Sequence, residues 1–142
     1  MYRKKEAGNE EGRMVRSIIA VVTGFLFIGA LSFGATFLLK AVMPGALTAR
    51  TESVPVLLLV TAYVAVFAVA GCYLAALLAG RSPMKHALIL GALGLIFNII
   101  GAIGRWDTAP AWFHIISVLL VMPYAWLGGR LREMRLRKAR AA

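Results

Sequence analysis

The sequence is poor in acidic residues, and none of them falls within a long apolar stretch. Its 142 residues include only six Asp and Glu, which lie in polar tails and connecting segments: Glu6, Glu10, Glu11, Glu52, Asp107 and Glu133. Proton-coupled carriers and pumps usually keep an ionisable side chain within the membrane in spite of its cost. A proton relay through a membrane-embedded carboxylate is therefore not expected.

Cysteine and histidine are also scarce. Cys72 is the single cysteine, which excludes an intrachain disulfide and a cysteine-ligated metal site. His86 and His114 begin two predicted helices that run in opposite directions, about 30 Å apart across a bilayer core, so one haem cannot bind both. The glycines form neither a G-x-G-x-x-G loop nor a P-loop, and no Ser, His and Asp share one depth. We therefore expect no cofactor, no metal and no enzymatic activity.

Long apolar stretches dominate what is present. Hydrophobic residues make up 61% of the chain, and the mean hydropathy is +0.80. Helices are predicted over about 17–40, 54–80, 83–104 and 109–128, each long enough to cross a hydrocarbon core of about 30 Å. Polar tails are predicted over 1–16 and 129–142. The fold class is thus all-α: one integral, multi-pass membrane domain forming an antiparallel four-helix transmembrane bundle.

Positive charge is distributed unevenly along the chain, whose net charge is +10. Thirteen of the sixteen Lys and Arg lie in the two tails and in the connection between the second and third helices. The two other connections hold only Lys40, Arg50 and Arg105. Because cytoplasmic segments of membrane proteins are enriched in Lys and Arg, both termini are predicted to be cytoplasmic.

Small residues recur every 3.5 residues on average in the helices, and such residues let two backbones approach closely in lipid. In the third helix the helix-packing face consists of Ala87, Gly91, Gly94 and Gly101, with Asn98 set among them. In the second helix it includes Ala65, Ala68, Cys72 and Ala75. In the first helix the same spacing selects Ala20, Thr23, Phe27, Ala30 and Gly34. The second and third helices are predicted to pack most tightly, joined by a short link in which Ser82 caps the third helix.

A polar cluster is predicted in the outer half of the bundle, near the end opposite the termini. Asn98 precedes Arg105 by seven residues, which places it about 10 Å below the outer surface at 1.5 Å per residue. The predicted cluster consists of Ser32, Thr36, Thr61, Asn98, His114 and Ser117. Such groups can hydrogen-bond one another and fix helix orientation, at about 0.6 kcal/mol on average and 1.7 at most. The alternative is a vestibule for a small ligand or ion; the structural role is favoured.

The C-terminal tail is strongly basic and is predicted to contact anionic lipid headgroups, at about 1 kcal/mol for each basic side chain. Its basic residues are Arg130, Arg132, Arg135, Arg137, Lys138 and Arg140. Nucleic acid is not expected as a partner, because the tail has no aromatic side chains on which bases could stack. The expected partner is therefore the lipid bilayer.

The segment LLVMPYAWLGGRLR, residues 119–132, resembles the last helix of many small uncharacterised bacterial inner-membrane proteins, in which a proline-interrupted apolar helix runs into a Gly-Gly-Arg basic exit. That resemblance implies the bacterial cytoplasmic membrane. The expected function is that of a small non-enzymatic accessory subunit or self-associating bundle, which could form a homo-oligomer or join a larger membrane complex. The alternative is a small homo-oligomeric channel or facilitator that uses the outer polar cluster.

Overall fold

The computed structural model describes the backbone of residues 2–45, 47, 53–79 and 82–141 and, within them, the side chains other than those of 2–11, 13 and 140. This part of the chain is almost entirely helical. Its elements are α1 (Tyr2–Val42), α2 (Val54–Ala79), α3 (Pro83–Gly104), the 3-10 helix η1 (Trp106–Thr108) and α4 (Ala111–Ala141). Each of the four α-helices contains a segment long and apolar enough to cross a membrane. The predicted all-α transmembrane bundle is confirmed.

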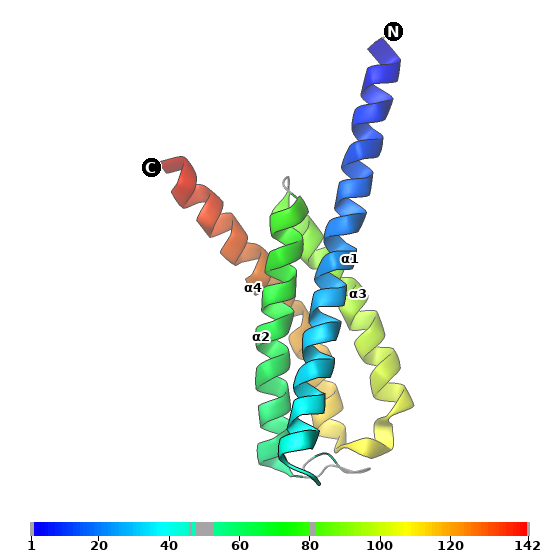
Figure 1. The fold of residues 1–142 in the computed structure, drawn as a ribbon, viewed down its shortest axis with the longest axis vertical. Coiled ribbons are helices and arrows are strands. Elements are labelled where there is room, and N and C mark those ends of the chain that lie inside the picture. Colours follow the sequence, from blue (N-terminus) through cyan, green and yellow to red (C-terminus); the bar gives the residue numbers. More distant parts are fainter. Residues whose placement is uncertain (1, 46, 48–52, 80–81, 142) are drawn as a thin grey trace.

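The four α-helices are antiparallel to their neighbours in sequence (Figure 1). We call the end of the bundle that holds both termini and the start of α3 the terminal end. The opposite end, which holds Val42 and η1, is the distal end. The halves of the bundle next to them are the terminal half and the distal half.

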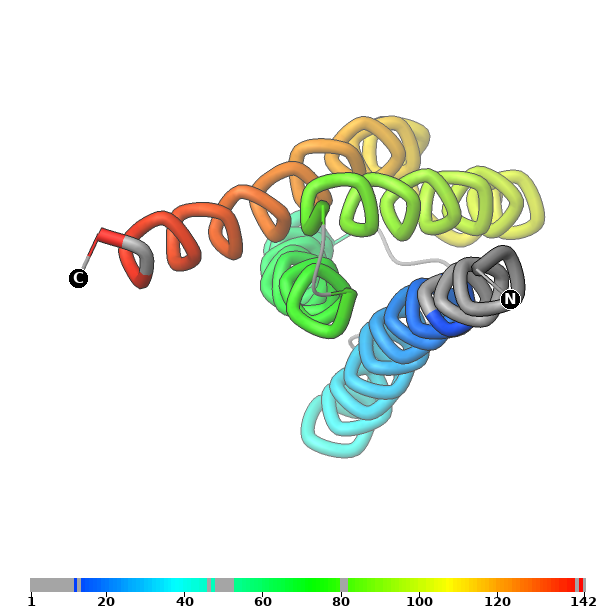
Figure 2. The backbone as a smooth tube through the Cα atoms, turned by 90° about the horizontal axis from the view of Figure 1, so that it is seen from above, coloured from blue at the N-terminus to red at the C-terminus, as the bar shows by residue number. Residues whose placement is uncertain are grey.

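The first and last helices extend beyond their apolar segments. The predicted helices begin near 17 and end near 128, whereas α1 begins at Tyr2 and α4 continues to Ala141. No proline lies between residues 2 and 16 to interrupt α1, and Pro123 lies inside α4 without ending it. The C-terminal part of α4, from Arg130 on, departs sideways from the other helices (Figures 1 and 2). We call this part the basic extension.

The helix starts differ in detail from the sequence expectation. Ser82 precedes α3 in a left-handed conformation (φ 51°, ψ 58°), and its side chain does not cap the helix. Its carbonyl oxygen instead accepts hydrogen bonds from the Lys85 amide and from Nδ1 of His86, both at 3.1 Å. Pro83 occupies the first turn of α3, where its missing N–H costs nothing.

The prediction that the second and third helices pack most tightly is wrong. α1 packs most extensively on α2, and α3 packs almost as extensively on α4, with α2 and α4 next. A side chain at Gly91 would collide with Ala125, and one at Gly94 would touch Val121 at 3.7 Å. The small-residue face of α3 is therefore directed mainly at α4.

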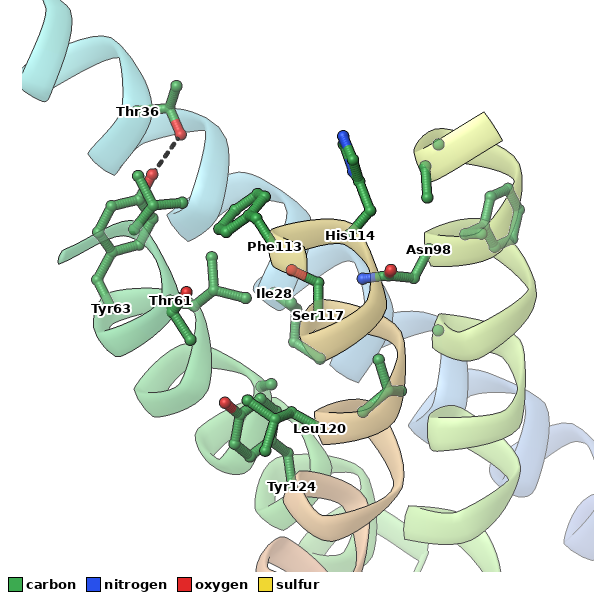
Figure 3. A pocket seen from close by; sticks show the side chains of 18 of the residues that line it. Ile28, Thr36, Thr61, Tyr63, Asn98, Phe113, His114, Ser117, Leu120 and Tyr124 are labelled. Atoms are coloured by element: carbon green, nitrogen blue, oxygen red, sulfur yellow. Dashed lines mark hydrogen bonds between the residues drawn. The ribbon is translucent and has the colours of Figure 1, made fainter. Parts of the chain in front are cut away.

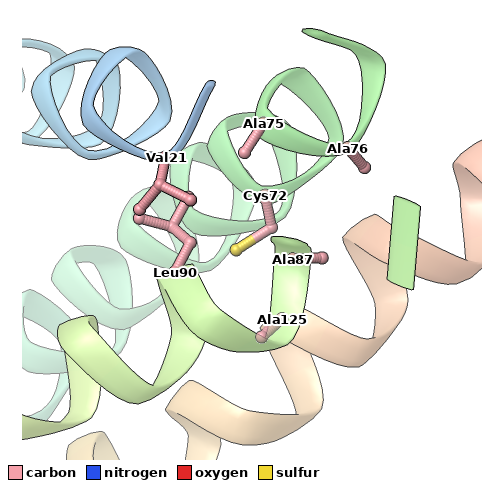
Figure 4. Packing of buried hydrophobic residues seen from close by; sticks show 7 residues of the cluster. All are labelled: Val21, Cys72, Ala75, Ala76, Ala87, Leu90 and Ala125. Atoms are coloured by element: carbon pink, nitrogen blue, oxygen red, sulfur yellow. The ribbon is translucent and has the colours of Figure 1, made fainter. Parts of the chain in front are cut away.

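The small residues of α2 contact two different helices. At Gly71, α2 crosses α1 beside Gly24, whose absent side chain would meet the Gly71 carbonyl oxygen at 2.9 Å. On its other side Cys72 lies against Gly128 of α4, where an added Cβ would approach the Val69 carbonyl oxygen to 2.8 Å. These crossings surround a cluster of small and medium side chains in the terminal half: Val21, Cys72, Ala75, Ala76, Ala87, Leu90 and Ala125 (Figure 4).

The inward face of α1 also differs from the expected one. Ala20 is fully buried, but Phe27, Ala30 and Gly34 are exposed. The buried side of α1 continues instead through Gly24 and on to partly buried positions such as Ile28. The contact line of α1 thus advances in steps of four from Ala20, instead of the expected alternation of three and four. Large apolar side chains cover the outside of all four helices, as expected for surfaces that face lipid.

Candidate functional site

A cavity of about 610 Å³ lies among the four helices and extends from the distal end to the middle of the bundle (Figure 3). At its distal mouth Lys40 and Arg105 contribute to the lining, and its inner limit includes Leu90, Gly91 and Cys72. The cavity exists because Ala68, Gly94 and Gly101, which were predicted to pack against a neighbouring helix, line open space instead. A volume of this size falls in the range of small-molecule sites.

Five of the six residues of the predicted polar cluster line this cavity: Thr36, Thr61, Asn98, His114 and Ser117. They come from all four helices, and Figure 3 shows them distributed around a common space. Ser32 does not line it; its hydroxyl oxygen is buried elsewhere on α1 and has no hydrogen-bond partner in the part of the chain that the structure describes.

Few hydrogen bonds join the polar side chains of the cavity to one another. The Thr36 and Tyr63 hydroxyls are 2.9 Å apart and connect α1 to α2. Thr61 donates to the carbonyl oxygen of Leu57 within its own helix, at 2.9 Å. Among the described residues, neither Asn98 nor Ser117 forms a hydrogen bond through its side chain. Most polar groups of the cavity therefore do not fix the helices to one another.

His114 is the most confined polar residue of the cavity. It is only 8% exposed, and its Nε2 atom has no hydrogen-bond partner among the described residues. Its ring stacks on Trp106 at 5.4 Å between centroids, and Phe113 meets it edge-on at 5.8 Å. These two aromatic contacts hold the imidazole beside the mouth, where it projects toward the distal end (Figure 3).

The mouth of the cavity carries positive charge. Lys40 from α1 and Arg105 from the end of α3 both contribute to the lining, and both are exposed. A guanidinium nitrogen of Arg105, Nη2, lies 3.6 Å from the position that a Cβ on Gly101 would take, so this side chain turns back along α3. Within the described ranges, no carboxylate lines the cavity. Asp107 lies nearby in sequence, but it belongs to exposed η1 and is absent from the lining.

Sequence reasoning missed several lining residues, including Lys40, Tyr63, Arg105 and Tyr124. Lys40 and Arg105 were assigned to the two less basic connections, and neither Tyr63 nor Tyr124 was included in the predicted cluster. The four-residue repeat that joins Thr36 to Lys40 on one side of α1 could have linked Lys40 to the cluster. No sequence signal indicates that Arg105 turns back toward Gly101.

The terminal end has a separate set of polar contacts. Nε2 of His86 lies 2.9 Å from the Ser17 hydroxyl, and Nε of Arg16 donates to the Leu78 carbonyl oxygen at 2.9 Å. His86 and His114 begin α3 and α4, which are antiparallel, so the two imidazoles lie at opposite ends of the bundle. Over the described residues, no three His, Cys, Asp or Glu side chains gather in a way that could hold a metal ion.

The basic extension carries its positive charge on exposed and partly buried side chains. Arg130 pairs with Glu133 at 3.5 Å, and the Arg135 guanidinium lies 5.7 Å from the centre of the Tyr73 ring. The Arg132 Nε atom is buried and has no hydrogen-bond partner among the described residues. The side chain of Arg140, also predicted to contact lipid, lies outside the described side chains.

Comparison with known proteins identifies no relative: no family model, no curated protein and no solved structure matches this chain. Functional inference for this integral membrane protein therefore depends on the geometry of its bundle and its cavity.

Proposed function

We propose that this chain is a non-enzymatic multi-pass membrane protein that admits a small molecule into the cavity of its distal half, as a binding protein or facilitator. The observation that carries this proposal is that Asn98, Ser117 and His114 line an open space without hydrogen-bond partners in the described part of the chain. A polar group left without a partner in hydrocarbon costs several kcal/mol. Water or a polar ligand in the cavity would remove that cost.

A purely structural role for the polar cluster agrees less well with the contacts. Side chains that orient helices do so by hydrogen bonding across helix boundaries. Of the cluster residues that line the cavity, only Thr36 forms such a bond, and its partner is Tyr63 on α2. Thr61 bonds to its own helix. This distribution supports binding and passage more than scaffolding.

The proposal includes an orientation. The excess of Lys and Arg at the terminal end supports a cytoplasmic location for both termini, and the resemblance of the last helix supports a bacterial inner membrane. The mouth of the cavity would then open to the outer side. A reporter that is active only in the cytoplasm, fused after Ala142, should be active. Activity only of an externally active reporter at that position would contradict the orientation.

Thiol labelling tests whether the cavity is open to water from the distal side. In a Cys72→Ala background, Ser117→Cys should react with a membrane-impermeant, charged thiol reagent applied to the outer face of intact cells. Leu119→Cys is the matched control, because this position on the same helix is 67% exposed on the lipid-facing side and should not react. Equal protection of both cysteines would contradict an open cavity.

A cavity-filling variant gives a second test of the same proposal. Gly94→Leu should reduce labelling of Ser117→Cys, because Gly94 lines the cavity and has only Val121 within 4 Å, at 3.7 Å. Gly104→Leu makes the same substitution on α3 where nothing lies within 4 Å, and it should leave the labelling rate unchanged. Equal rates in both variants would show that the labelled space is not this cavity.

A second function, as an accessory subunit or self-associating bundle, is favoured by the outward face of α1. Phe27, Ala30 and Gly34 are exposed, and an added side chain at Gly29 or Gly34 would meet nothing within 4 Å. Small residues exposed to lipid allow another helix to approach closely. Native mass spectrometry of the protein extracted with its lipids should detect the assembly, and Gly34→Leu should dissociate it. A monomer without a stoichiometric partner would contradict this function.

The basic extension is proposed to lie on anionic lipid headgroups. Its Arg and Lys side chains continue directly from the membrane-spanning part of α4, where the helix departs sideways from the bundle (Figure 2). The same mass spectra should show anionic lipids retained in preference to neutral ones. Replacing the described basic residues by Gln should abolish that preference; if it persists, the extension is not the site.

A further inference from the structure

We propose that the cavity selects an anionic amphiphile: a molecule with one negatively charged group, such as a carboxylate or phosphate ester, and a single apolar chain. This inference rests on the function proposed above and adds the chemical class of the ligand. It follows from the charge at the mouth, from one buried and unpartnered side chain, and from the change in lining between the mouth and the interior.

The mouth offers two cations, and no carboxylate among the described residues lines the cavity beside them. Lys40 and Arg105 contribute to one lining from different helices. The only ion pair described, between Arg130 and Glu133, lies in the basic extension. Because Arg105 turns back toward Gly101, its guanidinium is directed into the cavity instead of away from the bundle. A guanidinium in this position is suited to carboxylate or phosphate oxygens.

His114 also lines the cavity, with a hydrogen-bonding atom that no described residue satisfies. Its imidazole is 8% exposed, and the unpartnered Nε2 atom lies in a ring that lines the cavity. Trp106 and Phe113 pack on the ring, and because the Nε2 atom itself is buried, the ring would shift slightly to bring this atom to a bound anion. An Nε2–H that donates to an anion forms a charge-assisted hydrogen bond, which is stronger than one between neutral groups.

The interior of the cavity favours an apolar chain. Deeper than Asn98, the lining includes Leu90, Phe97, Leu120 and Val121. A small inorganic anion would leave this surface without a partner, whereas an alkyl or isoprenoid chain would contact it along its length. The hydroxyl of Tyr124 is one of the few polar groups at this depth (Figure 3). A charged head at the mouth with a chain directed inward therefore matches both parts of the lining.

The test uses Trp106 as its reporter, because this side chain stacks on His114. Trp112→Phe with Trp126→Phe leaves Trp106 as the only tryptophan of the chain. This protein, in nanodiscs of neutral lipid, is titrated with dodecyl phosphate and separately with dodecanol, which has the same chain without charge. Emission of Trp106 should change on binding, and the Kd of dodecyl phosphate should be at least about tenfold lower than that of dodecanol.

Charge variants identify the cations responsible. Lys40→Gln with Arg105→Gln should raise the Kd of dodecyl phosphate about tenfold and leave that of dodecanol unchanged. Both side chains are exposed, so folding should be retained. Asp107→Asn removes a nearby exposed charge that does not line the cavity, and Arg130→Gln removes a cation of the basic extension. Neither control should change the Kd more than about twofold.

The outcomes separate the ligand class from the proposed function. If dodecanol and dodecyl phosphate bind alike, and Gly94→Leu removes both, the ligand class is wrong and the cavity still binds small molecules. If Gly94→Leu leaves both titrations unchanged and also fails to protect Ser117→Cys from labelling, the function is wrong as well. If the Kd of dodecyl phosphate depends equally on Lys40, Arg105 and Arg130, general surface charge explains the binding and the inference is overturned.

Discussion

In the terminal half of the bundle Gly128 lies against the backbone of α2, whereas in the distal half Gly94 faces a cavity. Both glycines lie on helix surfaces that face other helices, yet Gly128 is in close helix–helix contact and Gly94 borders empty space. The difference lies in what stands opposite. Cys72 and the Val69 carbonyl oxygen meet Gly128 directly, but only the tip of Val121 comes within 4 Å of the Cβ position of Gly94.

The comparison shows how a bundle can combine a fixed part with an accessible one. In lipid, helices gain stability mainly from close packing and from interhelical hydrogen bonds. The close contacts at Gly24, Gly71, Gly91 and Gly128 all lie toward the terminal end. The distal half retains the hydrogen bond between Thr36 and Tyr63, and Phe25 meets Phe97 near the middle of the bundle, at 5.1 Å between ring centroids. Stability and binding are thus assigned to different halves.

The largest expected loss of stability comes from disrupting the close helix packing of the terminal half. Gly128→Ala should destabilise the protein by about 1–3 kcal/mol, the usual cost of overpacking, because the new Cβ would lie 2.8 Å from the Val69 carbonyl oxygen and the backbone would have to move. Gly12→Ala is the control: that position is open and should gain up to about 1 kcal/mol of helix propensity. Thermal unfolding in detergent measures both. Equal stability of the two variants would contradict the crossing of α2 and α4.

A smaller effect should follow from removing the one cross-helix hydrogen bond of the cavity. Thr36→Val should cost about 0.6 kcal/mol and no more than about 1.7, the range measured for such bonds in membrane proteins. Tyr63→Phe should cost a similar amount, and the double variant should cost little more than either single variant because both remove the same bond. Additive losses in this cycle would mean that the two hydroxyls act independently.

The smallest effect on stability is expected for a substitution of Asn98. Asn98→Leu should leave the unfolding free energy within about 0.5 kcal/mol of the parent, because no hydrogen bond of this side chain is lost. The same variant should bind dodecyl phosphate more weakly, because it removes an amide that lines the cavity and can donate a hydrogen bond to the ligand. A loss of stability above about 1.7 kcal/mol would instead favour a scaffolding role for the polar cluster.

Sequence patterns predicted the four helices and five of the polar residues that line the cavity for a simple reason. A run of apolar residues long enough to cross a bilayer has few alternatives to a helix, since every backbone polar group must be satisfied internally. Helical rise then fixes depth, which placed Thr61, Asn98 and His114 at similar distances from the distal end. Depth does not depend on which helices are neighbours.

Helix pairing and side-chain direction were harder to predict. The small residues of α2 could face any other helix, and nothing local to Cys72 indicates that its partner is Gly128. The buried side of α1 runs through Ala20 and Gly24 to Ile28, at steps of four, which left Phe27 and Gly34 outside, and nothing in the sequence of α1 marks that side. The path of the Arg105 side chain depends on the open space above Gly101, which exists only once the helices are assembled.

Gly128 and Gly129 mark the point at which α4 is in close contact with two neighbouring helices. We call this point the pivot, because a tilt of α4 would turn about it. Gly128 lies against α2, and Gly129 lies against Met84 and Ala87 of α3, so the helix is held from two sides at this point. His114 is about 21 Å from Gly128 along one arm, and Arg137 is about 14 Å along the other, at 1.5 Å per residue. A tilt of α4 by about 10° around the pivot would move His114 by about 4 Å and the basic extension in the opposite direction. The position of the basic extension at one face of the membrane and the width of the cavity near the other face are therefore mechanically linked through one helix.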